Sequence, residues 1–401
     1  MSVNIHRNKI RLAENLILHI AWIGLFALIA TLWIIQGIRA GVGMARLPWL
    51  SDAPPLSLDG APLVSVIFAA RDEAEKLPAA IQTLLAQDYP RFEVVAVNDR
   101  SQDRTPEILH ENERANSRLK VIDVANLPAG WLGKPHALVA AFEQSQGEWL
   151  VFTDADVHFA PDVLRRAIAL AQARQWDHLT LLASIDMRGF WEITAITYFG
   201  LGFVFGNEPW EASNTRSGRY VGVGAFQLVR RSAYEKSGGH RRLRMDVIED
   251  MKLGKLMKMA GLRSGVAVAQ DMVQVRWHSG LRNVIRGVTK NLFAACHYNA
   301  LIALVAMSLP LIMSVLPFFG LAFATGWARA FAGIAAGAAI LIHGAMIWST
   351  NVSPFYAFTH PLGAVIFSWM LARSAIATLL RGGVVWRDTF YPLEELRKGL
   401  V

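Results

Sequence analysis

The fold is decided by the stretch Glu148-Trp149-Leu150-Val151-Phe152-Thr153-Asp154-Ala155-Asp156-Val157, an apolar run that ends in two carboxylates one residue apart. Its apolar centre predicts a strand that is covered on both faces of a sheet. The Asp-x-Asp pair then lies at the carboxyl end of the strand, where open α/β sheets bind ligands. Two carboxylates there can hold a hard divalent cation, which in turn can hold a diphosphate. The alternative is a plain strand end, with a turn and the cap of a helix that begins near Pro161.

Composition indicates that part of the chain lies in a membrane. The 401 residues are 53% hydrophobic, and their mean hydropathy of +0.30 is high for a soluble protein. The formal net charge is +8, but the basic residues do not form a stripe within a recognisable nucleic-acid module, so we expect no nucleic acid as a partner. Anionic lipid headgroups and phosphorylated substrates account for the charge better. Cys296 is the single cysteine, which excludes an intrachain disulfide and a cysteine-based zinc site.

Hydrophobic stretches lie on both sides of a central region. Residues 16–37 predict a retained membrane anchor, because a cleaved signal peptide has a shorter apolar core. A proline-rich linker, residues 47–62, follows it. Residues 301–323, 328–348 and 362–380 are three further stretches that are long enough to span. If all three cross, the basic tail lies on the other side of the membrane from the central region, against the tendency of positive charge to stay on the cytoplasmic side. The alternative is therefore that one stretch is re-entrant, such as the one with Pro310 and Pro317.

The central region, residues 63–268, alternates short apolar runs with amphipathic helical patterns, which is typical of a mostly parallel α/β sheet. Its second strand ends in Asn98 and Asp99, whose side chains can hydrogen-bond a base or a ribose. We expect Thr105 to cap the helix whose first residue is Pro106. Lys134 opens a later helix, where its ammonium and the helix N-terminus can bind a phosphate together. A solvated surface lysine is the alternative.

Several further motifs follow Asp156 along the chain. Residues 190–205 are rich in aromatics and predict a segment at the membrane surface that admits a lipid, with a buried core helix as the alternative. Residues 220–229 predict a strand whose glycines let another backbone or a ligand approach closely. Asp250 stands at the start of a helix, where it either stabilises the helix dipole or removes a proton from an acceptor hydroxyl. Arg276 can clamp a diphosphate, and Trp277 can stack on a ring.

A basic amphipathic helix is predicted next, over residues 281–295. Arg282, Arg286 and Lys290 recur four residues apart on one face, and apolar residues occupy another. Such a helix fits an anionic membrane surface, which places the central region on the cytoplasmic side.

In their order along the chain, these motifs resemble those of the family 2 glycosyltransferases, which have a GT-A fold. The motifs are Asn98-Asp99, Gly133-Lys134, Asp154-Ala155-Asp156, Glu249-Asp250 and Arg276-Trp277. One anchor before the domain and several hydrophobic stretches after it look like the ceramide glucosyltransferase and hopanoid-associated group. The resemblance covers about residues 63–291, with weaker similarity around Trp386, Arg387 and Tyr391.

The resemblance implies an α/β architecture, in which a GT-A domain with a Rossmann-like mixed sheet carries one N-terminal and about three C-terminal transmembrane helices. We expect an anchor segment at 1–46, the linker at 47–62 and the catalytic domain at 63–279. An interface helix at 280–298, a transmembrane region at 299–381 and a tail at 382–401 complete the chain.

The resemblance also implies roles for the matched residues. Asp99 contacts the nucleotide base, which is usually uracil, Lys134 approaches the diphosphate, and Asp250 is the general base. Asp154 and Asp156 bind Mg²⁺ or Mn²⁺. The mechanism expected of the family is a single displacement that inverts the configuration of the sugar. The set implied for nucleotide-sugar binding is Asp72, Asn98, Asp99, Lys134, Asp154, Glu249, Arg276 and Trp277.

Two departures from the family pattern refine the predicted function. Asn98-Asp99 stands where the family often has two aspartates. Val273 stands where processive synthases carry Gln or Arg, and Gln274 comes one residue late. We therefore predict transfer of one sugar from a nucleotide sugar, usually a UDP-sugar, to a membrane lipid alcohol, at the cytoplasmic face of a bacterial inner membrane. The alternatives are a processive polysaccharide synthase and an inactive membrane scaffold, and the intact Asp154, Asp156 and Asp250 argue against the scaffold.

Overall fold

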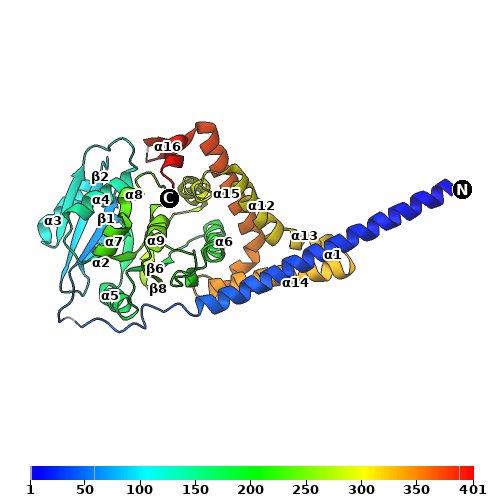
Figure 1. Cartoon of the computed structure of the whole chain (residues 1–401), viewed down its shortest axis with the longest axis horizontal. Coiled ribbons are helices and arrows are strands. Elements are labelled where there is room, and N and C mark those ends of the chain that lie inside the picture. The colour runs from blue at the N-terminus through cyan, green and yellow to red at the C-terminus, as the bar shows by residue number, and fades with distance from the viewer. Residues whose placement is uncertain (1, 58, 388) are drawn as a thin grey trace.

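An α/β body and a group of long helices make up the molecule (Figure 1). The computed structural model describes residues 2–57, 59–387 and 389–401. The long helix α1 (Ser2–Met44) extends away from the body to the N-terminus, and the C-terminus lies against the body (Figure 1).

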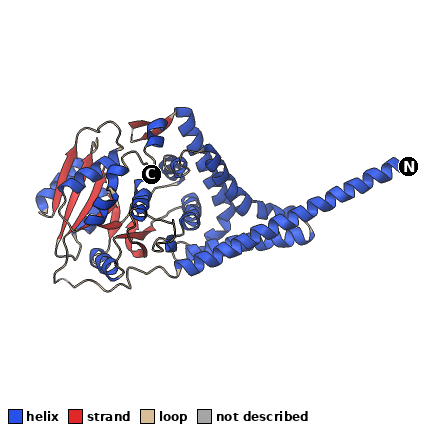
Figure 2. Cartoon of the chain, in the orientation of Figure 1, coloured by secondary structure: helices blue, strands red, loops and turns tan. Residues whose placement is uncertain are grey.

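A mixed sheet forms the centre of the α/β body (Figure 2). Its eight strands have the order β3-β2-β1-β4-β7-β6-β8-β5. β1, β2, β3 and β4 run parallel to one another, whereas β7 is antiparallel to both of its neighbours and β5 is antiparallel to β8. The strands are β1 (Val64–Ala70), β2 (Phe92–Asp99), β3 (Leu119–Val124), β4 (Trp149–Asp154), β5 (Val157–Phe159), β6 (His178–Ile185), β7 (Gln227–Arg230) and β8 (Ser264–Val275).

The register of the parallel strands brings the polar strand ends together. Ala69 of β1 is paired with Asp154 of β4, and Ala70 is paired with Asn98 of β2. Trp149, Leu150 and Val151 are 0% exposed, which confirms the prediction that β4 is covered on both faces. Helices of the body cover the sheet: α2 (Leu77–Leu85), α3 (Thr105–Ala115), α4 (Gly133–Gln144), α5 (Val163–Ala173), α7 (Arg231–Ser237), α8 (Gly239–Arg242) and α9 (Glu249–Met259).

Two local predictions for the body were wrong. Thr105 is not a cap: it lies inside α3, and its hydroxyl accepts a hydrogen bond from the backbone N–H of Glu73 at 2.9 Å. The strand predicted over residues 220–229 is reduced to β7, and residues 220–226 form a loop. The loop passes so close to α9 that a Cβ on Gly222 would meet the carbonyl oxygen of Asp250. The glycines therefore do permit a close backbone approach, but outside a strand.

Four helical segments are long and apolar enough to cross a membrane, as the sequence predicts. They cover Glu14–Met44, Ala300–Phe323, Gly326–Trp348 and Pro354–Arg381. The second segment consists of α12 (Ala300–Ser314) and α13 (Leu316–Phe323), the third is α14 (Gly326–Trp348), and the fourth joins the short helix η2 (Pro354–Thr359) to α15 (His360–Arg381). α14 packs along α1, and α15 packs along α12.

The aromatic segment forms α6 (Phe190–Asn207), which packs against α15, α10 and α14. Residues 192–198 of this helix are buried, whereas Phe190 and Trp191 are 46% and 52% exposed. The alternative of a buried core helix therefore holds for residues 192–198, because α15, α10 and α14 pack against this helix. The position at a membrane surface is wrong for these residues and stays a prediction for the rest of the helix.

The basic amphipathic helix is shorter than predicted. It is divided into α10 (Leu281–Thr289) and α11 (Leu292–Ala295), and Lys290 is the residue that directly follows α10. Arg282 and Arg286 are exposed, whereas Lys290 is partly buried. The chain ends in a hairpin of β9 (Gly383–Trp386) and β10 (Thr389–Pro392), followed by α16 (Leu393–Lys398). This tail returns to the α/β body, where Lys252 and Lys255 donate hydrogen bonds to the carbonyl oxygen of Val401 at 2.8 and 2.7 Å.

Candidate active site

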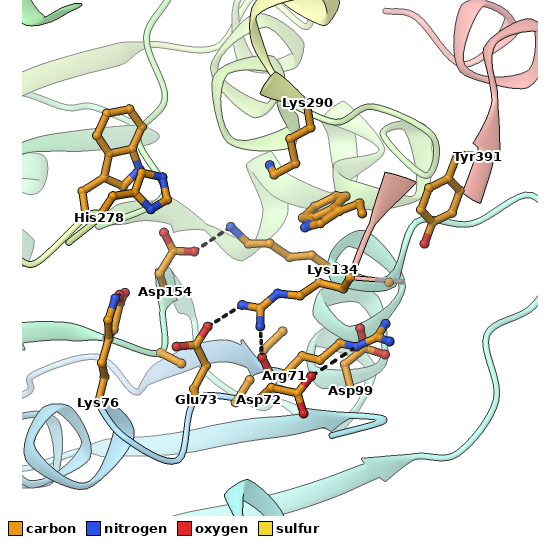
Figure 3. Close-up of a pocket in the computed structure, with 18 residues that line it drawn as sticks. Arg71, Asp72, Glu73, Lys76, Asp99, Lys134, Asp154, His278, Lys290 and Tyr391 are labelled. Carbon is orange, nitrogen blue, oxygen red and sulfur yellow. Dashed lines mark hydrogen bonds and ion pairs between the residues drawn. The ribbon is translucent and has the colours of Figure 1, made fainter. Parts of the chain in front are cut away.

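A pocket of about 420 Å³ lies at the carboxyl ends of β1, β2 and β4. Figure 3 shows its side chains converging from the strand ends below and from later segments above. The strand side contributes Asp72, Glu73, Lys76, Asp99, Gly133, Lys134, Asp154 and Asp156. The opposite wall comes from segments that follow β8 in the chain, with Trp277, His278, Lys290, Trp386, Arg387 and Tyr391.

Asp99 is the last residue of β2 and lines the pocket. The residue is 4% exposed, and its two oxygens accept hydrogen bonds from Arg100 at 2.7 and 3.1 Å. Asp72 also lines the pocket, and its carboxylate accepts the backbone N–H of Gln102 at 2.7 Å. Asn98 is not among the lining residues, because its amide donates to Asp123 at 2.8 Å on the neighbouring strand. Of this group, the structure brings Asp72 and Asp99 into the pocket.

Asp154 and Asp156 lie where β4 ends, and each accepts a hydrogen bond from a lysine. Lys134 at the start of α4 contacts Asp154 at 2.6 Å and Glu249 at 2.8 Å. Lys76 contacts Asp156 at 2.6 Å. Burial alone lowers the pKa of Lys134, but the surrounding carboxylates outweigh it and raise that pKa well above its ordinary value. Lys134 is therefore a charged side chain held between acids and not a solvated surface lysine.

The donor set of the pocket fits a divalent cation that shares its coordination with a ligand. Within the described part of the chain, no group of three or more His, Cys, Asp or Glu side chains could hold a metal ion alone. Two carboxylates at one strand end match the habit of Mg²⁺ and similar ions, which are bound by one or two carboxylates together with substrate phosphates. Asp154 and Asp156 are the side chains placed for that role.

Asp250 lies at the start of α9 and behind the pocket wall. Its Oδ2 accepts the N–H of Gly224 at 3.0 Å, and a Cβ on Gly224 would lie 2.6 Å from Oδ2 of Asp154. Burial, helped by the charge of Glu249, raises the pKa of Asp250 to about 6, against the opposing effect of Lys134. A carboxyl group with a pKa near neutrality is suited to accept a proton. Neither Glu249 nor Asp250 lines the pocket itself.

Arg276 and Trp277 are separated by the structure. Trp277 lines the pocket and packs against Phe199 of α6, with ring centroids 5.1 Å apart. The guanidinium of Arg276 turns towards α6, where it contacts the carboxylate of Glu192 at 2.6 Å and the carbonyl oxygen of Asp186 at 2.7 Å. Glu192 is 2% exposed, so the pair is a buried contact between β8 and α6.

Several lining residues were not identified from the sequence. Glu73 and Lys76 follow Asp72 on the loop after β1, and a polar loop at the end of the first strand was the available signal. His278 directly follows Trp277, and burial lowers its pKa to about 4. Lys290 was assigned to the membrane surface instead. The sequence shows weaker family similarity around Trp386, Arg387 and Tyr391 but indicates no role for these residues. They come from a hairpin more than two hundred residues beyond Asp154, and no local pattern places them at the pocket.

Comparison with known proteins extends these observations. Residues 65–238 match the family model described as "Glycosyl transferase family 2". A 4,4'-diaponeurosporenoate glycosyltransferase from Staphylococcus haemolyticus is 27% identical over 234 residues, which cover 57% of this chain and 60% of that protein. A beta-monoglucosyldiacylglycerol synthase from Trichormus variabilis is 28% identical over 239 residues, covering 56% of this chain and 49% of that protein. The match therefore spans between about half and three fifths of these relatives.

A solved structure shares the architecture across most of the chain. It is a mannosyltransferase from Pyrobaculum calidifontis in complex with GDP-Man and Mn²⁺. The TM-score is 0.53 at 20% sequence identity, and the match covers 91% of this chain and 99% of that one. At this identity the similarity shows the fold.

Proposed function

The chain contains a family 2 glycosyltransferase domain with the GT-A fold, and on this basis we propose that it transfers a single sugar from a nucleotide sugar to a membrane lipid alcohol. We propose a UDP-sugar as the donor, a Mg²⁺ or Mn²⁺ ion as the cofactor and inversion of the sugar configuration. One observation carries the proposal: Asp99, Asp154 and Asp156 line the same pocket. On the opposite wall, Tyr391 belongs to an apolar cluster that includes residues of the helices that can cross a membrane, and Trp277 packs against this cluster.

The strand ends supply the donor side. Asp99 is positioned to accept a hydrogen bond from a base, and Asp154 and Asp156 are positioned to hold the metal ion. The ion, when bound, neutralises the charge that develops on the leaving diphosphate. Lys76 and Lys134 contact the same carboxylates, so both ammonium groups lie next to the oxygens that would hold the ion. From there they can also face the phosphates of a bound donor and offset their charge.

Asp250 supplies the base. The N–H of Gly224 fixes one of its oxygens, and its raised pKa lets it accept the proton of an acceptor hydroxyl near neutral pH. The hydroxyl oxygen attacks the anomeric carbon from the side opposite the diphosphate, and the bond between that carbon and the diphosphate oxygen breaks. The proton ends on Asp250, and the configuration of the sugar is inverted.

The acceptor side supports a lipid. One apolar cluster includes Ile196 of α6, Met370 and Leu371 of α15, and Tyr391 of the hairpin, with Trp277 packed against it. The pocket wall and the membrane helices are therefore parts of one packed unit. Two relatives are named for a diaponeurosporenoate and for a glucosylated diacylglycerol, which also supports a lipid acceptor. We further propose that the domain division expected from the sequence holds and that the α/β body lies on the cytoplasmic face of a bacterial inner membrane.

The test is an assay of the full chain in detergent or nanodiscs with Mn²⁺, a panel of radiolabelled nucleotide sugars and a bacterial lipid extract. We expect label in one lipid species from one donor, and no label with Asp156→Ala, which removes a proposed metal ligand at the pocket. Label in a large polymer would instead support a processive synthase. If no nucleotide sugar were bound or consumed, and Asp250→Asn changed nothing in cells, the protein would be a scaffold.

A further inference from the structure

Lys290 occupies an unusual position in the pocket. It follows α10 and projects towards the carboxylates of the strand ends (Figure 3). Its ammonium nitrogen lies 4.1 Å from the ring centroid of Trp386 and donates a hydrogen bond to the side-chain oxygen of Asn291 at 2.8 Å. Both partners are uncharged, so the ammonium is held in place without being neutralised.

The other cations that line the pocket have carboxylate partners. Lys76 is paired with Asp156, and Lys134 is paired with Asp154 and Glu249. Arg387 is paired with Glu73 at 2.5 Å, and Arg71 lies 3.9 Å from Asp72. Among the residues that the structure describes, no carboxylate lies within 4.0 Å of the Lys290 ammonium.

An ammonium without a carboxylate partner is unfavourable inside a pocket, and the surroundings of Lys290 relieve this only in part. Its side chain is partly exposed. Desolvation by the surrounding protein lowers its pKa to about 8, although the more distant charges of Glu249, Asp250 and Asp154 act in the opposite direction. The face of an indole ring attracts a cation. An anionic ligand in the pocket would complete the stabilisation, because it would pair with a charge that is already held in position.

Arg276 does not take the role of pairing with an anionic ligand in the pocket. The sequence assigns it to the donor diphosphate, but Glu192 and the carbonyl of Asp186 hold its guanidinium on the α6 side. Lys290, in contrast, lines the pocket, on the wall that faces the strand ends. It belongs to a segment that lies beyond the residues matched by the family model.

We propose that Lys290 is a diphosphate-binding residue of the donor site and that Trp386 of the C-terminal hairpin holds it in position. The inference rests on the proposed function, since it names a further residue of the same site. It also gives the hairpin a role: the tail contributes the aromatic ring that supports a cation facing the metal carboxylates.

The test compares nucleotides with and without phosphates. Binding of UDP, GDP, CDP and ADP, and of the corresponding nucleosides, is measured calorimetrically on the detergent-solubilised full chain with Mn²⁺. For the diphosphate that the wild type binds, Lys290→Met is expected to weaken affinity roughly 10- to 100-fold, as for the loss of one charge-assisted hydrogen bond. Nucleoside affinity is expected to stay within about twofold. Lys290→Arg retains the charge and should retain most of the diphosphate affinity.

Two further variants separate the role of Lys290 from general effects of charge and folding. Lys258→Met removes one positive charge outside the pocket, where Lys258 donates to the carbonyl of Asn214, and should bind all ligands as the wild type does. Trp386→Leu keeps the ammonium but removes its support, and should lose part of the diphosphate affinity. Because Lys290→Met removes a partly buried charge that has no carboxylate partner, its melting temperature without ligand is expected to equal or exceed that of the wild type.

The outcomes are distinct. Unchanged diphosphate affinity in Lys290→Met would overturn the inference and leave the proposed function intact. An equal loss of diphosphate and nucleoside affinity, or a lower melting temperature without ligand, would assign Lys290 a structural role and would also overturn it. A wild-type protein that bound none of the four diphosphates would remove the proposed function and this inference with it.

Discussion

Asp250 differs from the other carboxylates of the site in its partners. Asp154 and Asp156 each contact an ammonium group. Asp250 accepts hydrogen bonds from the backbone N–H groups of Gly224 and Met251, and burial beside Glu249 disfavours its charge. The site thus combines two lysine-paired carboxylates, which are placed to hold a metal ion, with a carboxyl group behind the pocket wall that can exchange a proton near neutral pH.

The pH dependence of the reaction tests the role of Asp250. Because burial raises its pKa to about 6, and because only the unprotonated form can accept a proton, the transfer rate should fall as the pH drops through about 6. Asp250→Asn should lower the rate roughly 10²- to 10⁴-fold at pH 7.5, while donor binding changes little. Initial rates between pH 5 and pH 8.5, together with donor titrations, check both expectations.

Asp246 provides the control. Burial also raises the pKa of Asp246 to about 6, but this residue neither lines the pocket nor contacts Gly224. Asp246→Asn should keep the fall in transfer rate as the pH drops through about 6. If this fall disappeared in Asp246→Asn and persisted in Asp250→Asn, the assignment of Asp250 as the base would be contradicted.

At the scale of elements, the loop of residues 220–226 and the start of α9 act as one unit. Gly224 in this loop donates to Asp250, and a Cβ on Gly222 would collide with the carbonyl oxygen of Asp250. A Cβ on Gly254 would in turn meet the carbonyl oxygen of Val221. The loop and the helix can lie this close because glycine has no side chain, and their closeness orients the carboxylate of Asp250.

Gly222→Ala should therefore reduce both stability and transfer rate. The added methyl group meets backbone, which cannot rotate away, so the loop or α9 must move at a cost of about 1–3 kcal/mol. Thermal or denaturant unfolding measures the loss, and the transfer assay measures the displacement of Asp250. Gly218→Ala is the matched control, since a Cβ there has no heavy atom within 4 Å, and it should behave as the wild type. Equal behaviour of both variants would show that the close approach is unimportant.

At the scale of the whole molecule, contacts between the tail and the α/β body predict that both lie on the same side of the membrane. The tail is bonded to the body through Arg387 and through Val401, so we expect the three candidate spans between them to contribute an even number of complete crossings. α15 is the segment that we expect not to cross. It begins after η2, which packs on α14 and also contacts α6, it packs along α6, and it ends at β9 of the hairpin that lines the pocket. Its segment also has the lowest hydropathy of the four, 1.6, and the largest buried share, 39%.

Cysteine labelling tests this topology. In a Cys296→Ala background, Glu107→Cys on the body and Glu394→Cys on the tail are exposed positions, with side chains 61% and 80% exposed. Both should react with a membrane-impermeant maleimide from the same side of sealed vesicles. Thr325→Cys, between α13 and α14, should react from the opposite side, because the α12–α13 segment and α14 then form the two crossings. Labelling of the tail and the body from opposite sides would contradict the arrangement and favour three crossings.

Much of the fold could be predicted because its signals are local. The apolar run before Asp154 predicted a strand buried on both faces, and the four hydrophobic stretches all proved to be helices of sufficient length. The strand-end positions of Asp99, Lys134, Asp154 and Asp156 also followed from local pattern, because parallel strands bring their carboxyl ends to one edge of the sheet. These residues do line a common pocket.

The sequence by itself determined the strands, the strand-end carboxylates and the hydrophobic segments, because each depends on residues that are close in the chain. The tertiary structure alone decided which charges meet. It turned Arg276 to Glu192, 84 residues away, ended α10 before Lys290, and brought Trp386, which follows the three C-terminal hydrophobic segments in the chain, over that lysine. Ion pairing and desolvation act between neighbours in space, and no periodicity in the sequence records which neighbours those are.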